Sequence, residues 1–344
     1  MFARPAEPRP RPAAIAGWLA FVAALVFLMV VVGGITRLTE SGLSMVRWEP
    51  VSGAVPPLND TQWQAEFDHY KASPQYQQLN QGMTLADFKT IFFWEYVHRL
   101  LGRLIGLAFA LPLAWFAWRR AIPAGHGWKL GAILGLGALQ GAIGWWMVAS
   151  GLVDRPEVSH IRLAVHLLTA LIIFASLIWV ALDLKALARN SQARTARMPL
   201  LAIWALSILF LQFLFGAYVA GLDAGYAFNT WPKMGDEWFP AGTEMYDVFL
   251  RNFVDNPVVV QFVHRWLAFA VAGLAVWLGL LAWLRGAWLE GALLIAAVTV
   301  QILLGILTIL SGVQIDIAVA HQGMAALLLA AMIATAHRLG ERKA

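Results

Sequence analysis

The sequence predicts an all-α membrane protein in which eight transmembrane helices form two pseudo-symmetric four-helix bundles. Three observations predict this fold class: the composition, the length of the uncharged segments and a repeat within the chain. Of the 344 residues, 60% are hydrophobic and 13% are charged, whereas soluble domains contain about 45–50% apolar and about 25% charged residues. The apolar residues are concentrated in long segments, which excludes an ordinary soluble enzyme, a disordered chain and a fibrous repeat.

Eight segments are long and apolar enough to cross a bilayer as helices, which requires about 20 residues each. Six of them contain no Asp, Glu, Lys or Arg. The second contains Glu95, Arg99 and Arg103, and the sixth contains a single arginine. No Ala-x-Ala cleavage pattern follows the first segment, so we expect an anchor helix rather than a signal peptide. The predicted spans are Ile15–Ile35, Ile91–Trp118, Leu130–Val153, Leu163–Leu182, Met198–Leu222, Pro257–Leu284, Gly291–Gln314 and Ile317–His337.

The charges between the spans predict the orientation of the chain. With both termini on the inner side, the inner segments carry 14 Lys and Arg but four acids, and the longer outer segments carry eight Lys and Arg and 15 acids. An excess of Lys and Arg in short inner loops is typical of the cytoplasmic side. The pI of about 9.7 therefore reflects topology, and we predict a lipid bilayer and no nucleic acid as partner.

Two outer connections, Thr36–Thr90 and Asp223–Asn256, are long and rich in aromatic residues. Within the first, Trp63, Phe67 and Tyr70 are spaced i, i+4, i+7, which predicts a short helix at the membrane interface. The aromatic residues fit an interfacial belt and also a cap over a ligand bound at the outer surface. We expect both.

The two halves of the chain resemble each other. Glu95-Tyr-Val-His-Arg99 recurs as Gln261-Phe-Val-His-Arg265, and Gln140 corresponds to Gln301 at a similar offset. Because each copy has four spans, the two copies keep the same orientation in the membrane, which makes this a parallel repeat. The predicted division is a tail (1–14), a first half (15–182) with its outer loop (36–90), an inner linker (183–197), a second half (198–338) with its outer loop (223–256), and a tail (339–344).

Four histidines occupy equivalent places in this repeat. His98, His166, His264 and His321 each lie within about two turns of the outer start of an even-numbered span. One intramembrane histidine commonly just bonds to a neighbouring helix. Four at matched positions favour a functional role, because ionisable groups in a bilayer are costly. The other four are expected to be solvated: His69, His126, His160 and His337.

Two histidines on facing helices favour an axially ligated haem in each half. Cysteine is absent and no HExxH motif occurs, which disfavours zinc and copper sites. Arginines near the outer edge are expected to pair with haem propionates, although snorkelling at the interface is the alternative reading. They are Arg99 and Arg103 in the first half and Arg265 in the second.

Both sites lie near the same face, which argues against an electron path across the membrane and for transfer between neighbouring porphyrins. The halves are not equivalent, because Glu95 in the first corresponds to Gln261 in the second, and an amide does not titrate. This difference predicts that the first half performs chemistry while the second holds a cofactor. The alternative is that Glu95 only forms a salt bridge with an arginine.

Together these motifs resemble the haem A synthase family, and they are most similar to its cysteine-free branch in alphaproteobacteria and mitochondria. The resemblance covers nearly the whole chain after about residue 15. It rests on the four histidine motifs and on further segments that precede the second span. These segments are Gly33-Gly-Ile-Thr-Arg-Leu-Thr-Glu-Ser-Gly-Leu-Ser44, Trp48-Glu-Pro50 and Pro56-Pro57.

The resemblance implies an oxidoreductase that converts the C8 methyl group of haem O into a formyl group, giving haem A for cytochrome oxidase. It implies that His264 and His321 are the axial ligands of one haem b, that His98 and His166 hold the substrate haem, and that Glu95 is needed for turnover. It further implies a location in the cell inner membrane. The implied partners are haem O synthase, cytochrome oxidase assembly factors and an unidentified electron acceptor.

Two other functions compete with this one. A non-catalytic di-haem cytochrome b that passes electrons at the outer face would bind two haem b groups and neither haem O nor haem A. A haem exporter would need a polar path from the inner side, and the inner halves of the spans carry few polar residues.

Overall fold

The structure is a computed structural model that describes residues 10–48 and 52–341. The described chain is built from helices and connecting loops, and eight of its helices are long and apolar enough to span a membrane. Parts of the predicted tails and Glu49-Pro50 of the Trp48 motif lie outside the described residues. The eight long helices are α1 (Pro12–Leu38), α4 (Leu85–Trp118), α5 (Gly127–Val148), α6 (His160–Arg189), α7 (Leu200–Gly221), α9 (Pro257–Leu284), α10 (Trp288–Leu310) and α11 (Ile315–Gly340).

All eight predicted spans are confirmed as helices, and the largest differences are at their ends. Helix α4 begins at Leu85, before the predicted start at Ile91, because Thr84 and Asp87 form a capping box that satisfies the free N–H groups of the first turn. Helix α6 continues to Arg189 instead of ending at Leu182. It passes through Asp183 because Lys129 pairs with this carboxylate at 3.0 Å.

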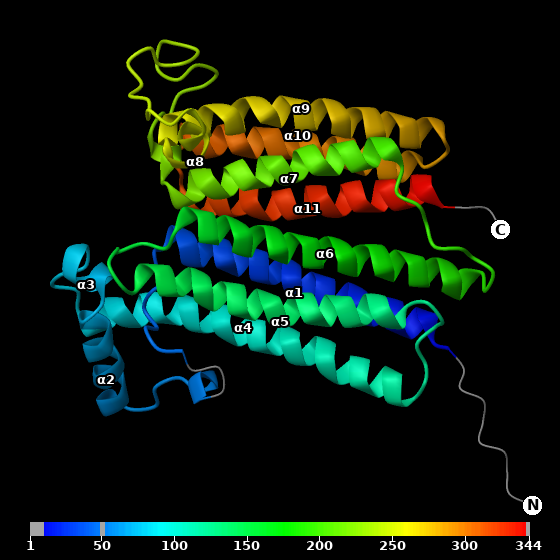
Figure 1. The fold of residues 1–344 in the computed structure, drawn as a ribbon, viewed down its shortest axis with the longest axis horizontal. Coiled ribbons are helices and arrows are strands. Elements are labelled where there is room, and N and C mark those ends of the chain that lie inside the picture. The colour runs from blue at the N-terminus through cyan, green and yellow to red at the C-terminus, as the bar shows by residue number, and fades with distance from the viewer. Residues whose placement is uncertain (1–9, 49–51, 342–344) are drawn as a thin grey trace, which may run out of the picture.

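The long helices pack as two groups of four (Figure 1). Helices α1, α4, α5 and α6 form one group, and α7, α9, α10 and α11 form the other. The groups meet where α1 and α6 pack against α7 and α11. This arrangement is consistent with the predicted duplication. The exact division into halves and linker stays a prediction.

The interface between the groups includes a close contact of α1 with α11. Gln322 on α11 donates from Nε2 to the main-chain oxygen of Val30 on α1 at 2.7 Å. A Cβ atom at Gly34 would lie 2.8 Å from Oε1 of the same glutamine, so only glycine fits there without movement. Helix α1 therefore contributes to the interface between the two groups, together with α6.

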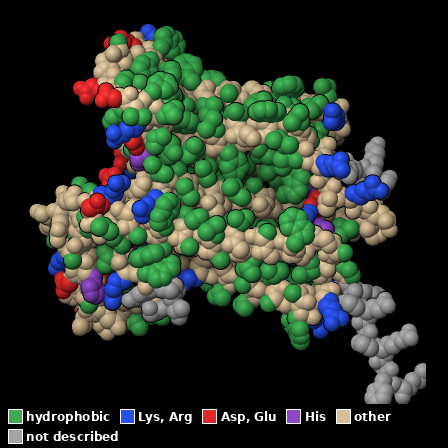
Figure 2. All heavy atoms as spheres, viewed as in Figure 1, with side chains coloured by type: hydrophobic (Ala, Val, Ile, Leu, Met, Phe, Trp, Pro, Cys, Tyr) green, Lys and Arg blue, Asp and Glu red, His purple; other side chains and the backbone are tan. Residues whose placement is uncertain are grey.

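The long sides of the molecule are apolar, and the charged side chains gather towards its two ends (Figure 2). Large hydrophobic side chains such as Leu111, Trp204 and Leu284 are exposed along the helices. Exposed apolar surface of this extent needs an apolar solvent. The chain is a multi-pass membrane protein.

Shorter elements cover one end of the helices. They are α2 (Asp60–Lys71), α3 (Pro74–Gln78), α8 (Asn252–Asp255) and the 3-10 turns Ser52–Ala54, Ala149–Gly151, Ala224–Tyr226 and Phe249–Arg251. The predicted short helix in the first outer loop is confirmed as α2, where the Asn59 side chain accepts from the Gln62 N–H.

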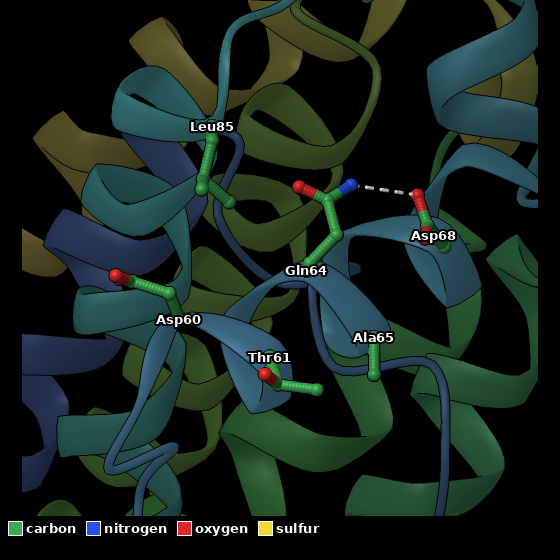
Figure 3. A pocket seen from close by; sticks show the side chains of 6 residues that line it. All are labelled: Asp60, Thr61, Gln64, Ala65, Asp68 and Leu85. Atoms are coloured by element: carbon green, nitrogen blue, oxygen red, sulfur yellow. Dashed lines mark hydrogen bonds between the residues drawn. The ribbon is translucent and has the colours of Figure 1, made fainter.

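Two of the three aromatic residues of α2 pack against α4 instead of facing outward. Phe67 and Tyr70 are buried and stack on Phe88 at the start of α4. Burial raises the pKa of Tyr70, so its phenol stays neutral and bonds to Gln75 and Asn80. The opposite face of α2 is a shallow polar surface (Figure 3), lined by Asp60, Thr61, Gln64, Ala65 and Asp68 together with Leu85.

Candidate functional site

The four intramembrane histidines lie on the four helices that begin at the capped end of the molecule, α4, α6, α9 and α11 (Figure 1). His166, His264 and His321 are in the second turn of their helices. His98 is almost four turns into α4, because the first turns of that helix carry the cap. All four side chains are partly buried.

The histidines form two pairs, one in each group of helices. His98 interacts electrostatically with His166, and His264 interacts electrostatically with His321, so the two rings of each pair lie near each other. The pairs are the ones that the duplication predicts. Each pair brings together imidazoles from two different helices, which is the arrangement that a bis-histidine haem site requires.

His166 lies in a small recess on the neighbouring helix α5. Nε2 of Gln140 lies 3.1 Å from Nδ1 of His166 and donates to its main-chain oxygen at 3.0 Å. One turn later, a Cβ atom at Gly144 would lie 3.0 Å from Cε1 of the same ring. The amide and the glycine together limit how this imidazole can turn.

The second group of helices has two similar glutamine and glycine contacts, of which the first repeats the arrangement in full. On α7, Nε2 of Gln212 lies 3.1 Å from Nδ1 of His264 and donates to its main-chain oxygen at 2.9 Å. A Cβ atom at Gly216 would lie 3.0 Å from Cε1 of His264. The third copy pairs Gln301 and Gly305 on α10 with His321, at 3.2 Å and 2.9 Å respectively.

The role of these glutamines is not among the features predicted from the sequence, where Gln140 and Gln301 are only marks of the repeat and Gln212 has no assigned role. The available signal was the motif Gln-x-x-x-Gly, which occurs on three odd-numbered spans, each directly preceding a span with one of the histidines.

The fourth histidine has different surroundings. A Cβ atom at Gly33 of α1 would lie 3.4 Å from Nε2 of His98, and Met29 stands one turn earlier, where the other helices carry glutamine. The Met29 side chain ends beside Gly102, since a Cβ atom there would lie 3.4 Å from its methyl group. Among the described residues, no hydrogen bond reaches the His98 ring.

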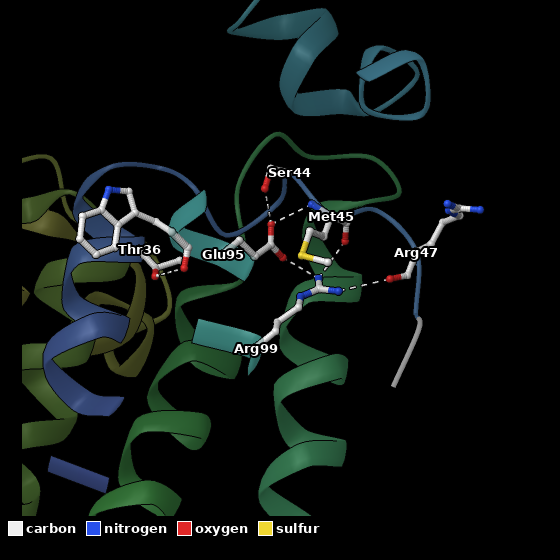
Figure 4. Close-up of polar contacts among 7 residues, drawn as sticks. Thr36, Ser44, Met45, Arg47, Glu95 and Arg99 are labelled. Atoms are coloured by element: carbon white, nitrogen blue, oxygen red, sulfur yellow. Dashed lines mark hydrogen bonds and ion pairs between the residues drawn. The ribbon is translucent and has the colours of Figure 1, made fainter. Parts of the chain in front are cut away.

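Glu95 is 2% exposed and is fully engaged with the outer loop (Figure 4). One carboxylate oxygen accepts from the Ser44 hydroxyl at 2.7 Å and from the Met45 N–H at 2.8 Å. The other forms an ion pair with Arg99. Arg99 also donates to the main-chain oxygens of Met45 and Arg47. The salt bridge weighed as an alternative for Glu95 is therefore present, and it ties α4 to the segment that follows α1.

The equivalent residues of the second half have the same architecture. Gln261 donates to the main-chain oxygen of Ala224 at 2.8 Å, and its own Oε1 accepts from Arg265 at 3.1 Å. Arg265 is buried and donates to the oxygens of Phe228 and Thr230, both at 2.8 Å. Each half thus uses an i, i+4 pair to fasten its outer loop, and only the first pair contains a carboxylate.

Two of the three arginines predicted to pair with haem propionates already have partners in the outer loops. The guanidinium groups of Arg99 and Arg265 are used by loop carbonyls, as described above. Arg103 lies one turn beyond Arg99 on α4 and is partly buried. Their binding to a propionate stays a prediction.

The prediction that the other four histidines are solvated is wrong for most of them. His337 is 3% exposed and contacts Asp183 at 3.0 Å, because α6 and α11 bring the two together at the inner end. His126 is also buried. His160 is half-buried and pairs with Asp255 of α8. His69 is exposed as predicted.

The donor set fits a haem better than a metal ion held by protein alone. No cluster of three or more His, Asp or Glu side chains suited to a metal occurs in the described part of the chain. The histidine pairs supply two nitrogen ligands each, as a porphyrin iron needs. The side-chain Oε1 atoms of Gln140, Gln212 and Gln301 are buried without a hydrogen-bond partner. An iron-bound imidazole needs an acceptor beside Nδ1, and rotation of the amide by half a turn would exchange its Nε2, which lies beside Nδ1, for this oxygen.

Known proteins similar to this chain are consistent with these features. The family model of the COX15-CtaA cytochrome oxidase assembly proteins matches residues 16–333. A protein named heme A synthase from Rhizorhabdus wittichii is 58% identical, covering 100% of this chain and 99% of its own length. Proteins of the same name from Sphingopyxis alaskensis and Novosphingobium aromaticivorans are 53% and 48% identical over 97% and 96% of this chain, and 94% and 96% of their own lengths.

Proposed function

Since the chain belongs to the COX15-CtaA family of cytochrome oxidase assembly proteins, we propose that it is a haem A synthase. As an oxidoreductase of haem A biosynthesis, it would oxidise the C8 methyl group of haem O to a formyl group. The single observation that carries this proposal is the pair of histidine sites, of which only the first adjoins a buried carboxylate. The chain would act in the cell inner membrane with both termini in the cytoplasm.

In this proposal the first half binds the substrate. His98 and His166 would ligate the iron of haem O from opposite faces, which fixes the direction in which the C8 methyl group points. Arg99 and Arg103, at i and i+4 on α4, are the proposed propionate partners. The farnesyl tail of haem O would lie in the lipid, which is accessible from the apolar sides of the helices (Figure 2).

Glu95 is the proposed proton acceptor. With water as the oxygen source, conversion of R–CH3 and H2O to R–CHO releases four electrons and four protons, and Glu95 would take up protons as they are released. Glu95 shares one face of α4 with His98, at i and i+3, and it is a carboxylate where the second half has an amide. The Ser44 hydroxyl and the Met45 N–H orient its Oε2, so its acceptor position is fixed relative to the site.

The second half would hold one haem b as a cofactor, with His264 and His321 as the residues that bind its iron. Its chemistry would be to pass on the electrons taken from the substrate to an acceptor outside the chain. Arg265 would orient a propionate while it fastens the outer loop. The chain itself contributes the fixed imidazoles, set by Gln212 and Gln301.

The test is the pigment composition of the purified protein and of a Glu95→Gln variant. Both would be produced in cells that make haem O but lack another haem A synthase, and the pigments would be extracted and separated by chromatography. We expect haem b, haem O and haem A in the wild type, and haem b and haem O without haem A in E95Q. Asp68→Asn, a change at an exposed position of α2, is the matched control and should form haem A normally.

Two outcomes would contradict the proposal. Normal haem A formation by E95Q would remove the catalytic role of Glu95. Wild-type protein that contains two equivalents of haem b and neither haem O nor haem A would instead support the non-catalytic cytochrome.

A further inference from the structure

The four histidines are held in two different ways. Three of them contact a glutamine of the neighbouring helix, and each of these rings presents Cε1 to a glycine while Nε2 lies farther from it, at 3.7–3.9 Å from the glycine's Cβ position. The His98 ring presents Nε2 to Gly33 instead, at 3.4 Å, with Cδ2 as the next nearest atom. His98 thus differs from the others in the orientation of its ring as well as in its lack of an amide partner.

We propose that Gln140, Gln212 and Gln301 are positioning residues that hold their imidazoles for iron, and that Met29 leaves His98 as the releasable ligand of the substrate haem. This inference rests on the proposed function. It assigns the firm ligand of the first half to His166 and the labile one to His98.

The contacts supply the physical reason. In the iron-bound state Nδ1 carries the ring proton, so the amide would present its oxygen to Nδ1–H, and this hydrogen bond would restrict rotation of the imidazole about its side-chain bonds. Methionine has no donor or acceptor of comparable strength and has three rotatable bonds. The His98 imidazole therefore turns away from the iron without breaking a hydrogen bond to the described chain.

The histidine without a glutamine lies in the half that has to exchange its haem in every turnover. A cofactor stays bound through many turnovers, whereas haem O has to enter and haem A has to leave in each one. Both ligands of the second half have a glutamine, Gln212 for His264 and Gln301 for His321. His98, the histidine without a glutamine, lies in the half that contains Glu95.

A reciprocal exchange of side chains tests the proposal. Met29→Gln gives His98 the amide it lacks, and Gln212→Met gives His264 the surroundings of His98. Each purified holoprotein would be mixed with excess apomyoglobin, and the pigments that remain bound would be extracted over time. Haem O plus haem A reports release from the first half, and haem b reports release from the second.

We expect M29Q to slow the release of haem O plus haem A about fivefold, the effect of one added hydrogen bond, with haem b unaffected. We expect Q212M to speed the release of haem b about fivefold, with haem O plus haem A unaffected. In each variant, the low-spin electron paramagnetic resonance signal should shift only for the haem whose histidine lies beside the substituted residue. A general loss of stability would not produce such a selective shift.

Unchanged release rates in both variants, or equal changes at both haems, would overturn the proposal. If M29Q does not fold, Q212M alone still tests the positioning role, because methionine and glutamine have similar volume and length. Absence of haem O and haem A from the wild type would contradict the proposed function instead, and the release of haem b from Q212M would still decide the role of the glutamine.

Discussion

Gly305 is the position where an added methyl group most directly disturbs a proposed iron ligand. In a Gly305→Ala variant, the new Cβ would lie 2.9 Å from Cε1 of His321, whereas carbon atoms in good contact are about 3.5–4.0 Å apart. The ring has to move by roughly half an ångström or more, and Gln301 and α10 oppose the movement. Overpacking of this kind costs about 1–3 kcal/mol, which corresponds to a roughly 5- to 150-fold loss of haem affinity.

The assay is the haem b content of the purified protein, followed by titration of the depleted protein with haem b at the Soret band. Gly273→Ala on α9 is the control, since a Cβ atom there meets nothing within 4 Å. We expect G305A to bind haem b more weakly and G273A to resemble the wild type. If G305A contains a full equivalent of haem b with an unchanged spectrum, His321 is not an axial ligand in the way we propose.

Two further predictions concern the supports of the fold. Replacement of Arg265 by Ala removes the donor that fastens loop 223–256, so limited proteolysis should cut this loop several-fold faster than in the wild type; an unchanged cleavage rate would show that the loop is held by other contacts. Asp183→Asn leaves the Lys129 ammonium, which is 19% exposed, without its carboxylate and should lower the free energy of unfolding by about 2–3 kcal/mol, measured by denaturation in detergent. Asp68→Asn, which breaks an exposed pair, should lower the free energy of unfolding far less, and equal losses in the two variants would contradict this reasoning.

The fold was predictable because the bilayer imposes a length on every span. Uncharged segments of about 20 residues can satisfy their backbone groups in lipid only as helices, and this condition is visible in one sequence. The early start of α4 was visible in principle too, since Thr84-x-x-Asp87 is a capping pattern. It was missed because hydropathy falls at Lys89, before the apolar segment begins.

The pairing of the histidines followed from the repeat, but the surroundings of each ring did not. When the two halves are aligned, α7 corresponds to α1, and Met29 occupies the position of Gln212. Because this one copy lacks the glutamine, the alignment does not reveal the motif that the other three copies share. The burial of His337 could not be predicted, because it depends on Asp183, 154 residues earlier. The loop contacts of Arg99 and Arg265 could not be predicted either. Their acceptors are main-chain oxygens of an irregular loop, and every residue type carries such an oxygen.

The smallest motif that recurs in this molecule is one pair of adjacent helices, the first with a glycine recess and the second with one imidazole. Such a hairpin supplies a ligand to one face of a flat macrocycle and cannot grip it alone. Two hairpins are the minimum that can ligate a macrocycle from both faces, and four hairpins make two such sites side by side. A synthetic hairpin copied from α10 and α11 should therefore bind a metalloporphyrin only as a dimer, with an occupancy that rises with the square of peptide concentration.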